Sequence, residues 1–134
     1  MSAVRLVRSA ELFGGAPYAY AATAPAHARV LQLAGSCPLD VAGRVVGPGD
    51  VAAQTRQCLA NLGTVLAECG AGLSDVLGTR VLVASTDRAD LLAAWEVVAS
   101  AFGEHDVPST LLGVTVLGYE GQLVEIEAVA ALLD

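Results

Sequence analysis

The chain of 134 residues contains no lysine, and its basic residues are seven arginines. Without lysine the protein cannot form a lysine Schiff base, anchor pyridoxal phosphate or build the lysine-containing phosphate loop of nucleotide-binding proteins. Acidic residues outnumber basic ones by 14 to 7, which gives a net charge of −7. Because nucleic-acid binding needs a basic surface, the sequence predicts no nucleic-acid partner.

Cysteine is scarce as well, and its spacing has no recognisable pattern. The three cysteines, Cys37, Cys58 and Cys69, include no C-x-x-C pair. The sequence therefore predicts neither a disulfide framework nor a zinc site, and we expect no metal and no organic cofactor. Cys58 and Cys69 fall at nearly the same angle around a predicted helix, so both are predicted to be core residues.

Long hydrophobic runs are missing too. No apolar run reaches the roughly 18 residues that span a bilayer, and the N-terminal arginines are not followed by the apolar core of a signal peptide. We therefore expect a cytoplasmic protein with no membrane partner. Yet 54% of the residues are hydrophobic and only 16% are charged, whereas soluble domains have roughly half and a quarter. The surplus apolar surface predicts a subunit interface.

The pattern of apolar residues indicates one domain, residues 1–134, that combines strands and helices. Residues 51–69 and 88–102 have the apolar spacing of amphipathic helices, and Asp50 and residues 85–87 are suitable N-caps. Strands are expected at residues 4–7, 18–24, 29–35 and 76–84. This order predicts an α+β domain in which the helices pack on one face of a mixed sheet.

The C-terminal region reads as two further strands. Residues 108–117 and 122–130 are rich in β-branched side chains and flank a glycine-containing turn, so they predict a β-hairpin. In the second run apolar residues alternate with Glu125 and Glu127. Because strand side chains alternate between faces, both carboxylates are expected on one face, which either meets water or lines a site.

Several short motifs follow one another in a characteristic order. They are Pro17-Tyr18, Leu33-Ala-Gly-Ser-Cys-Pro-Leu-Asp40, Gly49-Asp50-Val-Ala-Ala-Gln54-Thr55, Asn61-Leu62, Gly70 to Asp75-Val76, Pro108 to Leu117 and Val124-Glu125-Ile126-Glu127-Ala128. Over nearly its full length the chain thus resembles the RidA (YjgF-type) family of reactive-intermediate deaminases. The resemblance implies a chorismate-mutase-like α+β fold, assembled as a homotrimer with clefts between subunits. Members with deaminase activity hydrolyse 2-imino or enamine acids to 2-keto acids and ammonia.

The resemblance also implies site residues. The family's cleft tyrosine matches Tyr18, and the glutamate that positions water matches Glu125. The arginine that grips the substrate carboxylate is not matched. Relatives read Pro-Ala-Arg-Thr or Pro-Ala-Arg-Ser where this chain reads Val107-Pro108-Ser109-Thr110, which places Ser109 at the arginine position. Losing that bidentate grip would cost about 2–5 kcal/mol of binding.

Two further family positions differ, and one thiol lies nearby. Trp95 stands in place of a common asparagine, where it could narrow the pocket or stack on a ligand, and Ser36 stands in place of a glutamine. Backbone N–H groups near Gly35 and Ser36 are expected to orient the ligand. Cys37 follows at the strand end, but a reactive thiol needs a lowered pKa from a neighbouring cation, which the sequence does not reveal.

The remaining candidates lie on the strands around this cleft. Ser109 and Thr110 are expected on opposite sides of their strand, and Ser109 is interpreted as a hydrogen-bonding ligand group, since no histidine is placed to activate it. Arg80 could replace the missing positive charge or form an ion pair at a subunit interface. Glu127 is interpreted as an interface residue.

These residues support two hypotheses of different kinds. The first is a homotrimeric enzyme acting on a small imine, enamine or related carbonyl-derived metabolite, but not an efficient 2-imino acid deaminase. In it Glu125 is a general base and Tyr18 donates a hydrogen bond. The second is a non-catalytic small-molecule-binding protein on the same fold, in which Glu125 is a solvated carboxylate and Tyr18 a packing anchor.

Overall fold

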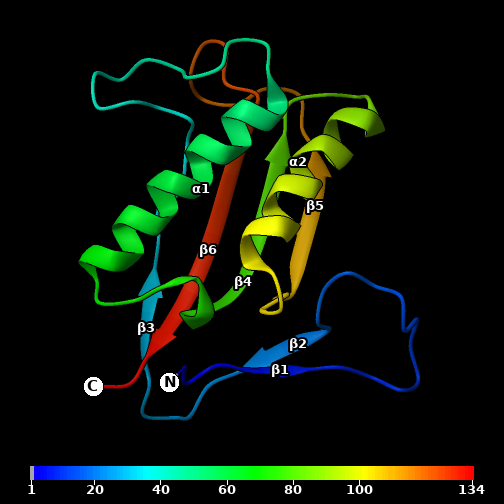
Figure 1. Ribbon diagram of the computed structural model, residues 1–134, viewed down its shortest axis with the longest axis vertical. Helices are drawn as coiled ribbons and strands as arrows, with labels where there is room; N and C mark the ends of the chain where they lie inside the picture. Colours follow the sequence, from blue (N-terminus) through cyan, green and yellow to red (C-terminus); the bar gives the residue numbers. More distant parts are fainter. Residues whose placement is uncertain (1) are drawn as a thin grey trace.

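The computed structural model describes residues 2–134, which form two α-helices against one face of a mixed sheet (Figure 1). This confirms the α+β class. In chain order the elements are β1 (Arg5–Val7), β2 (Ala21–Thr23), β3 (Arg29–Gln32), α1 (Val51–Glu68), a 3-10 turn (Leu73–Asp75), β4 (Val76–Val83), α2 (Arg88–Phe102), β5 (Ser109–Gly113) and β6 (Val124–Leu132).

The main sheet has four strands in the order β3-β6-β4-β5. β6 runs antiparallel to both β3 and β4, and β5 runs parallel to β4. The predicted hairpin between residues 108–117 and 122–130 is therefore wrong, because β4 lies between the two strands. β4 is mainly apolar, and such a strand favours a central place in the sheet with neighbours on both sides. The crossover through α2 places β5 along the edge of β4 that faces away from β6.

Both helices begin at the aspartates that the sequence indicates. An Asp50 carboxylate oxygen accepts from the Ala53 N–H at 3.0 Å, and an Asp87 oxygen accepts from the Ala89 N–H at 2.9 Å. Such caps satisfy backbone donors that have no partner within the first helical turn. At the other end of α2, Gly103 takes a φ of 56°, which favours glycine.

The prediction that Cys58 and Cys69 share the core is half wrong. Cys58 is fully buried and its thiol donates to the Val124 carbonyl at 3.6 Å, whereas Cys69 is exposed. Cys69 is the C-cap of α1, whose last helical residue is Glu68. Its backbone has therefore already left the helix, and the angular spacing that places Cys58 in the core does not apply to it. Burial raises the pKa of Cys58 far above its ordinary value, which keeps this thiol protonated.

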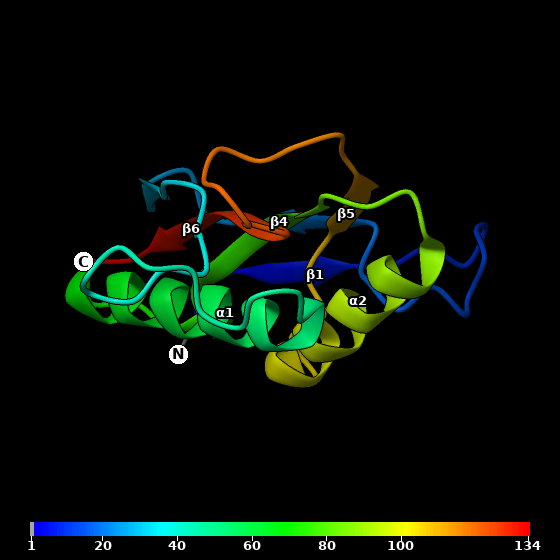
Figure 2. The ribbon, with the colours of Figure 1, turned by 90° about the horizontal axis from the view of Figure 1, so that it is seen from above.

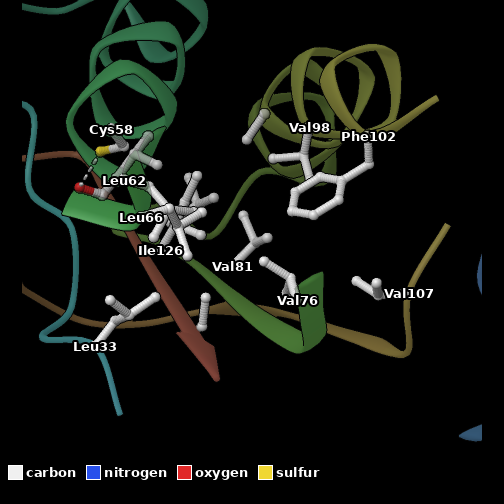
Figure 3. Close-up of a cluster of buried hydrophobic side chains, with 14 of the residues drawn as sticks. Leu33, Cys58, Leu62, Leu66, Val76, Val81, Val98, Phe102, Val107 and Ile126 are labelled. Carbon is white, nitrogen blue, oxygen red and sulfur yellow. Dashed lines mark hydrogen bonds between the residues drawn. The ribbon is translucent and has the colours of Figure 1, made fainter. Parts of the chain in front are cut away.

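The core fills the layer between the helices and the sheet. Figure 3 shows Leu62 and Leu66 of α1 over Ile126, and Val98 and Phe102 of α2 on the side of β4 and the β5 connection. All of these side chains are less than a tenth exposed. The helix-facing side of the sheet is thus fully used for packing, which leaves its opposite face for other contacts.

A buried glutamine fixes the turn that leads into β6. Gln54 on α1 has no exposed surface. Its amide donates to the carbonyls of Gly47 and Gly121 at 3.2 and 3.1 Å, and its oxygen accepts from the Leu123 N–H at 2.7 Å. These bonds satisfy backbone groups of two separate loops. They also set where β6 begins, one residue before Glu125.

The sheet has an open face on the side away from the helices (Figure 2). By strand register, Glu125 lies beside Leu82 and Leu112 there, and Glu127 lies beside Arg80 and Thr110; these residues, with Val30, Gln32 and Val129, form what we call the open face. The predicted alternation of β6 is confirmed, since Val124, Ile126 and Ala128 are buried while both glutamates are partly exposed. Within residues 2–134, no helix combines the length and apolarity needed to cross a membrane.

Candidate functional site

One oxygen of the Glu125 carboxylate is held by two side chains. The Cys37 thiol donates to Oε1 at 3.1 Å, and the Gln122 amide donates to the same oxygen at 3.3 Å. Within residues 2–134 no hydrogen-bond donor reaches Oε2. The carboxylate is therefore fixed in orientation by one oxygen, while the other can accept a proton or bind a water molecule.

The segment after β3 leaves room for the Glu125 carboxylate at Gly35. A Cβ added to Gly35 would lie 2.7 Å from Glu125 Oε2, which is shorter than any real carbon–oxygen contact. The next residue, Ser36, is bonded to Ile126 through its backbone N–H and carbonyl at 2.7 and 3.0 Å. Glycine at position 35 thus permits the close packing that defines what we call the Glu125 cluster: Gly35, Cys37, Gln122 and Glu125.

Cys37 acts in this cluster as a donor rather than as a nucleophile. Partial burial, and then the hydrogen bond and negative charge of Glu125, raise its pKa from 9.0 to about 11. A thiolate nucleophile needs the opposite shift. The loop is held in place by Asn61 on α1, whose amide donates to the carbonyls of Cys37 and Leu39 at 2.9 Å each.

Ser36 does not present its polar groups to a ligand. Its side chain is buried and donates to the Cys58 carbonyl at 2.6 Å, while its backbone N–H donates to Ile126. The sequence places Ser36 among the ligand-binding residues, but its hydrogen-bonding groups join the sheet to α1.

A second group of candidates surrounds a hollow of about 480 Å³ at the β5 edge, which we call the Thr110 hollow. Its lining includes Tyr18, Trp95, Ser109 and Thr110. Tyr18 meets the ring of Trp95 edge-on, with ring centres 6.5 Å apart, so it has the packing role considered from the sequence. Within residues 2–134 its hydroxyl has no hydrogen-bond partner, which leaves it able to donate to a ligand.

Ser109 and Thr110 lie on opposite faces of β5, as the sequence predicts. Ser109 pairs in register with the buried Thr79, whose hydroxyl donates to Ser109 Oγ at 2.8 Å. Thr110 pairs with the exposed Arg80 on the open face. Ser109 therefore points toward α2, and only Thr110 shares a face with Glu125. The sequence assigns Ser109 to the arginine position, but by strand register Thr110, not Ser109, shares the face of Glu125.

Arg80 is already paired. Its guanidinium lies 3.5 Å from the Glu127 carboxylate across the β4–β6 ladder, and both side chains are partly exposed. The two residues line a hollow of about 470 Å³ together with Tyr18 and Thr110. Such an exposed pair contributes little stability, but Glu127 balances the charge of Arg80 on this face.

The Glu125 cluster and the Thr110 hollow are separate places on one chain. Thr110 and Glu125 are two strands and two register positions apart on the open face. With strands about 4.8 Å apart and residues about 3.3 Å apart along a strand, this corresponds to about 12 Å. One small ligand cannot touch both groups of a single chain. The sequence predicts that the candidate residues line one cleft. Within a single chain they instead form two separate groups, the Glu125 cluster and the Thr110 hollow.

Sequence reasoning missed two participants, Gln122 in the Glu125 cluster and Thr79 as the partner of Ser109. For Gly35 it considered only the backbone N–H, whereas the structure shows that the missing side chain makes room for the Glu125 carboxylate. The clean alternation around Glu125 could have indicated Gln122, which lies on the turn just before that strand. Nothing in the local sequence indicates Thr79, because its contact depends on the parallel register of β4 with β5. Among residues 2–134, no three His, Cys, Asp or Glu side chains gather as a metal site.

The raised pKa of Cys37 leads to a direct chemical prediction. At pH 7.5 iodoacetamide is expected to alkylate the exposed Cys69 first and Cys37 much more slowly, because the Cys37 thiolate forms only as the pH approaches 11. In Glu125→Gln the carboxylate charge is gone, so Cys37 is expected to react several-fold faster. Mass spectrometry of the labelled peptides measures both rates. A Cys37 rate unchanged by Glu125→Gln would mean that burial alone protects the thiol.

Comparison with known proteins gives consistent matches over most of the chain. The family model described as endoribonuclease L-PSP matches residues 13–132. A RutC family protein of Pyrococcus horikoshii is 36% identical over 100 residues, which cover 75% of this chain and 77% of that protein. The mitochondrial protein mmf1 of Schizosaccharomyces pombe is 31% identical over 132 residues, covering 97% of this chain and 77% of the relative.

Solved structures resemble the whole fold. A Rid family protein of unknown function from Yersinia pestis superposes with a TM-score of 0.87 at 32% identity, covering 97% of this chain and 99% of that one. A member of the YjgF/YER057c/UK114 family from Mycobacterium tuberculosis has a TM-score of 0.66 at 33% identity, covering 95% and 98%. The similarity therefore includes the positions of both candidate groups.

Proposed function

The chain belongs to the RidA (YjgF-type) family, whose model is described as endoribonuclease L-PSP, and from this we propose that it hydrolyses a small uncharged imine or enamine. The observation that carries the proposal is the Glu125 carboxylate, which is held at Oε1 by Cys37 and Gln122. Its free oxygen has the properties required of a general base: fixed position, partial burial and access from the open face.

The chemistry requires a base and little else. Water adds to the imine carbon, forming a C–O bond, while Glu125 Oε2 accepts the proton that the water loses. Glu125 then returns that proton to the nitrogen, which gives a carbinolamine. The hydroxyl proton of this intermediate next moves to the nitrogen through the same carboxylate, the C–O bond becomes the carbonyl double bond, the C–N bond breaks, and ammonia and a carbonyl compound leave. Cys37 and Gln122 donate to Oε1 throughout, so the carboxylate keeps its orientation as its protonation changes.

We propose that the two groups meet between subunits of a homotrimer. The Glu125 cluster of one copy would face the Thr110 hollow of the next, which removes the separation of about 12 Å within one chain. The apolar composition supports this assembly, as do exposed side chains on and beside the open face: Val30 is 66% exposed and Val116 is 76% exposed. A second copy covering them would bury apolar surface.

The proposal that the substrate is not a 2-imino acid depends on the arginine position. Aligning the family's Pro-Ala-Arg-Thr proline to proline puts Pro108 first and Thr110 at the arginine. Thr110 is also the residue that faces the same side as Glu125. A single neutral hydroxyl cannot replace a bidentate guanidinium, and the nearby Arg80 is paired with Glu127. The ligand end bound there is therefore uncharged.

The family description mentions an endoribonuclease, but RNA cleavage is not the activity that we propose. The chain has a net charge of −7, and the open face holds Arg80 against the carboxylates of Glu125 and Glu127. RNA binding depends on neutralising phosphates with basic side chains. This surface would repel a polyanion.

The alternative is a non-catalytic small-molecule-binding protein, and the missing arginine favours it. Release of ammonia from imines generated in situ distinguishes the two. We expect the protein to hydrolyse an uncharged imine at least tenfold faster than a 2-imino acid of the same chain length. Faster hydrolysis of the 2-imino acid would contradict the uncharged substrate. Saturable binding of the carbonyl product without any hydrolysis would favour the alternative.

A further inference from the structure

We propose that the half-open apolar cavity between α2 and β5 is the pocket for an apolar substrate tail, so that the substrates are uncharged imines with a tail of about six carbons. This inference rests on the proposed function and specifies its substrate class. The cavity lies on the helix side of the sheet, apart from the open face and from the Glu125 cluster.

The cavity has the size and the lining of a side-chain pocket. Its volume is about 260 Å³. Most of its wall is apolar and comes from the second half of α2 and the segment before β5: Val98, Ala99, Phe102 and Val107. Cavities of about 150 Å³ lined by such residues stay dry and bind benzene. An apolar group of six or more carbons therefore fits here.

The wall carries no free charge. Asp106 lies at the rim, but its carboxylate is engaged by the Arg8 guanidinium in an ion pair. A charged ligand end would therefore lose its hydration in the cavity without gaining a partner. The lining excludes charged tails and accepts apolar ones.

Three residues connect this cavity to the Thr110 hollow. Pro17, Trp95 and Ser109 line both spaces, so these side chains lie at the boundary between them. A ligand whose head lies beside Thr110 and Tyr18 can thus extend its tail past Trp95 toward Val98. The tryptophan at this position then has a function: it separates the reacting end from the tail.

A pair of hydroxyls marks the junction. Thr79 and Ser109 share one hydrogen bond of 2.8 Å, and within residues 2–134 neither hydroxyl has another partner. Two hydroxyls joined by one bond leave one proton to donate. This proton is available to the carbonyl oxygen or imine nitrogen of a ligand, which fixes the depth to which the tail enters.

Trp95 is the only tryptophan of the chain, so its fluorescence reports on this cavity and on the adjoining Thr110 hollow, and the dependence on tail length distinguishes the two. The experiment titrates the native protein with a series of uncharged primary amides, from acetamide through 4-methylpentanamide to octanamide, while Trp95 emission is recorded. We expect the affinity to rise about fourfold with each methylene until the tail has about six carbons. It should then rise no further, because the cavity is full.

Ala99→Leu fills the cavity from α2, and Val98→Ile adds one methyl to the same wall. We expect Ala99→Leu to weaken the binding of 4-methylpentanamide at least tenfold and Val98→Ile to weaken it less. The binding of acetamide should be unaffected by either variant. Ala89→Leu, at an exposed position of the same helix, is the matched control and should bind like the native protein. Thermal unfolding checks that each variant is folded.

The results separate this inference from the proposed function. Affinity that does not depend on tail length, or that Ala99→Leu leaves unchanged, overturns the cavity as a tail pocket whatever the enzymatic activity. Tail-dependent binding that Ala99→Leu abolishes supports it. If such binding occurs but no imine is hydrolysed, only the proposed function fails.

Discussion

Glu125→Gln is expected to lower kcat for imine hydrolysis by a factor of about 10²–10⁴, the usual contribution of a general base. The amide keeps the shape of the side chain, and its oxygen can still accept from Cys37 and Gln122, but it cannot take a proton from water. KM should change little, because Glu125 acts on water rather than on the ligand's binding groups. Steady-state ammonia release measures both constants.

Glu127→Gln is the matched control for this experiment. Glu127 lies two residues further along β6, on the same face, and pairs with Arg80 instead of the Cys37 thiol. Its replacement removes the same charge from the same strand but leaves the general base Glu125 intact. The activity should therefore stay within a few-fold of the native value. Equal losses in the two variants would indicate a general effect of charge on the open face and would contradict the role of Glu125.

Thr110→Arg is expected to raise kcat/KM for 2-imino acids by a factor of tens to thousands, which corresponds to the roughly 2–5 kcal/mol of a desolvated charge pair. The new guanidinium would stand on the open face, where Thr110 lies beside Arg80 in the ladder and Glu127 balances the added charge. It would bind the substrate carboxylate at two points. Hydrolysis of uncharged imines should not improve.

Ser109→Arg tests whether the face of the strand matters. Ser109 points toward α2, where its oxygen accepts from Thr79. An arginine there would lose this bond and place a charge against an apolar cavity. We expect no gain with 2-imino acids and a lower melting temperature. A gain in Ser109→Arg but not in Thr110→Arg would show that the arginine position is assigned to the wrong residue.

Local signals predicted the elements of the fold well. Residues 88–102 form α2 with the predicted bounds, because an aspartate caps one end and Gly103 ends the other. The alternation around Glu125 correctly placed its carboxylate on the face opposite the core. The pairing of strands could not be predicted in this way. Whether residues 109–113 join β6 or β4 depends on the crossover and on the apolar surface of β4, which are not local properties.

The same limit applies to the site. Ser109 and Thr110 are neighbours in the sequence, yet their side chains lie on opposite faces of β5. An assignment of the arginine position that is wrong by one residue therefore moves the side chain to the other face. Short motifs with one substituted position do not fix this register. Cys37 is a second example, because strand pairing, not sequence proximity, brings it next to Glu125. Only the structure reveals that its thiol is a hydrogen-bond donor with a raised pKa.

We expect the Glu125 cluster of one copy to work with the Thr110 hollow of another. Mixed assemblies test this shared site most directly. Glu125→Gln disables the first group, and Thr110→Trp blocks the second at an exposed position. When the two inactive variants are unfolded together and refolded in equal amounts, about one quarter of the clefts in a cyclic trimer should combine two intact halves. Recovery of about a quarter of the native activity is the predicted result. Activity that stays at the level of the separate variants would contradict a site shared between subunits.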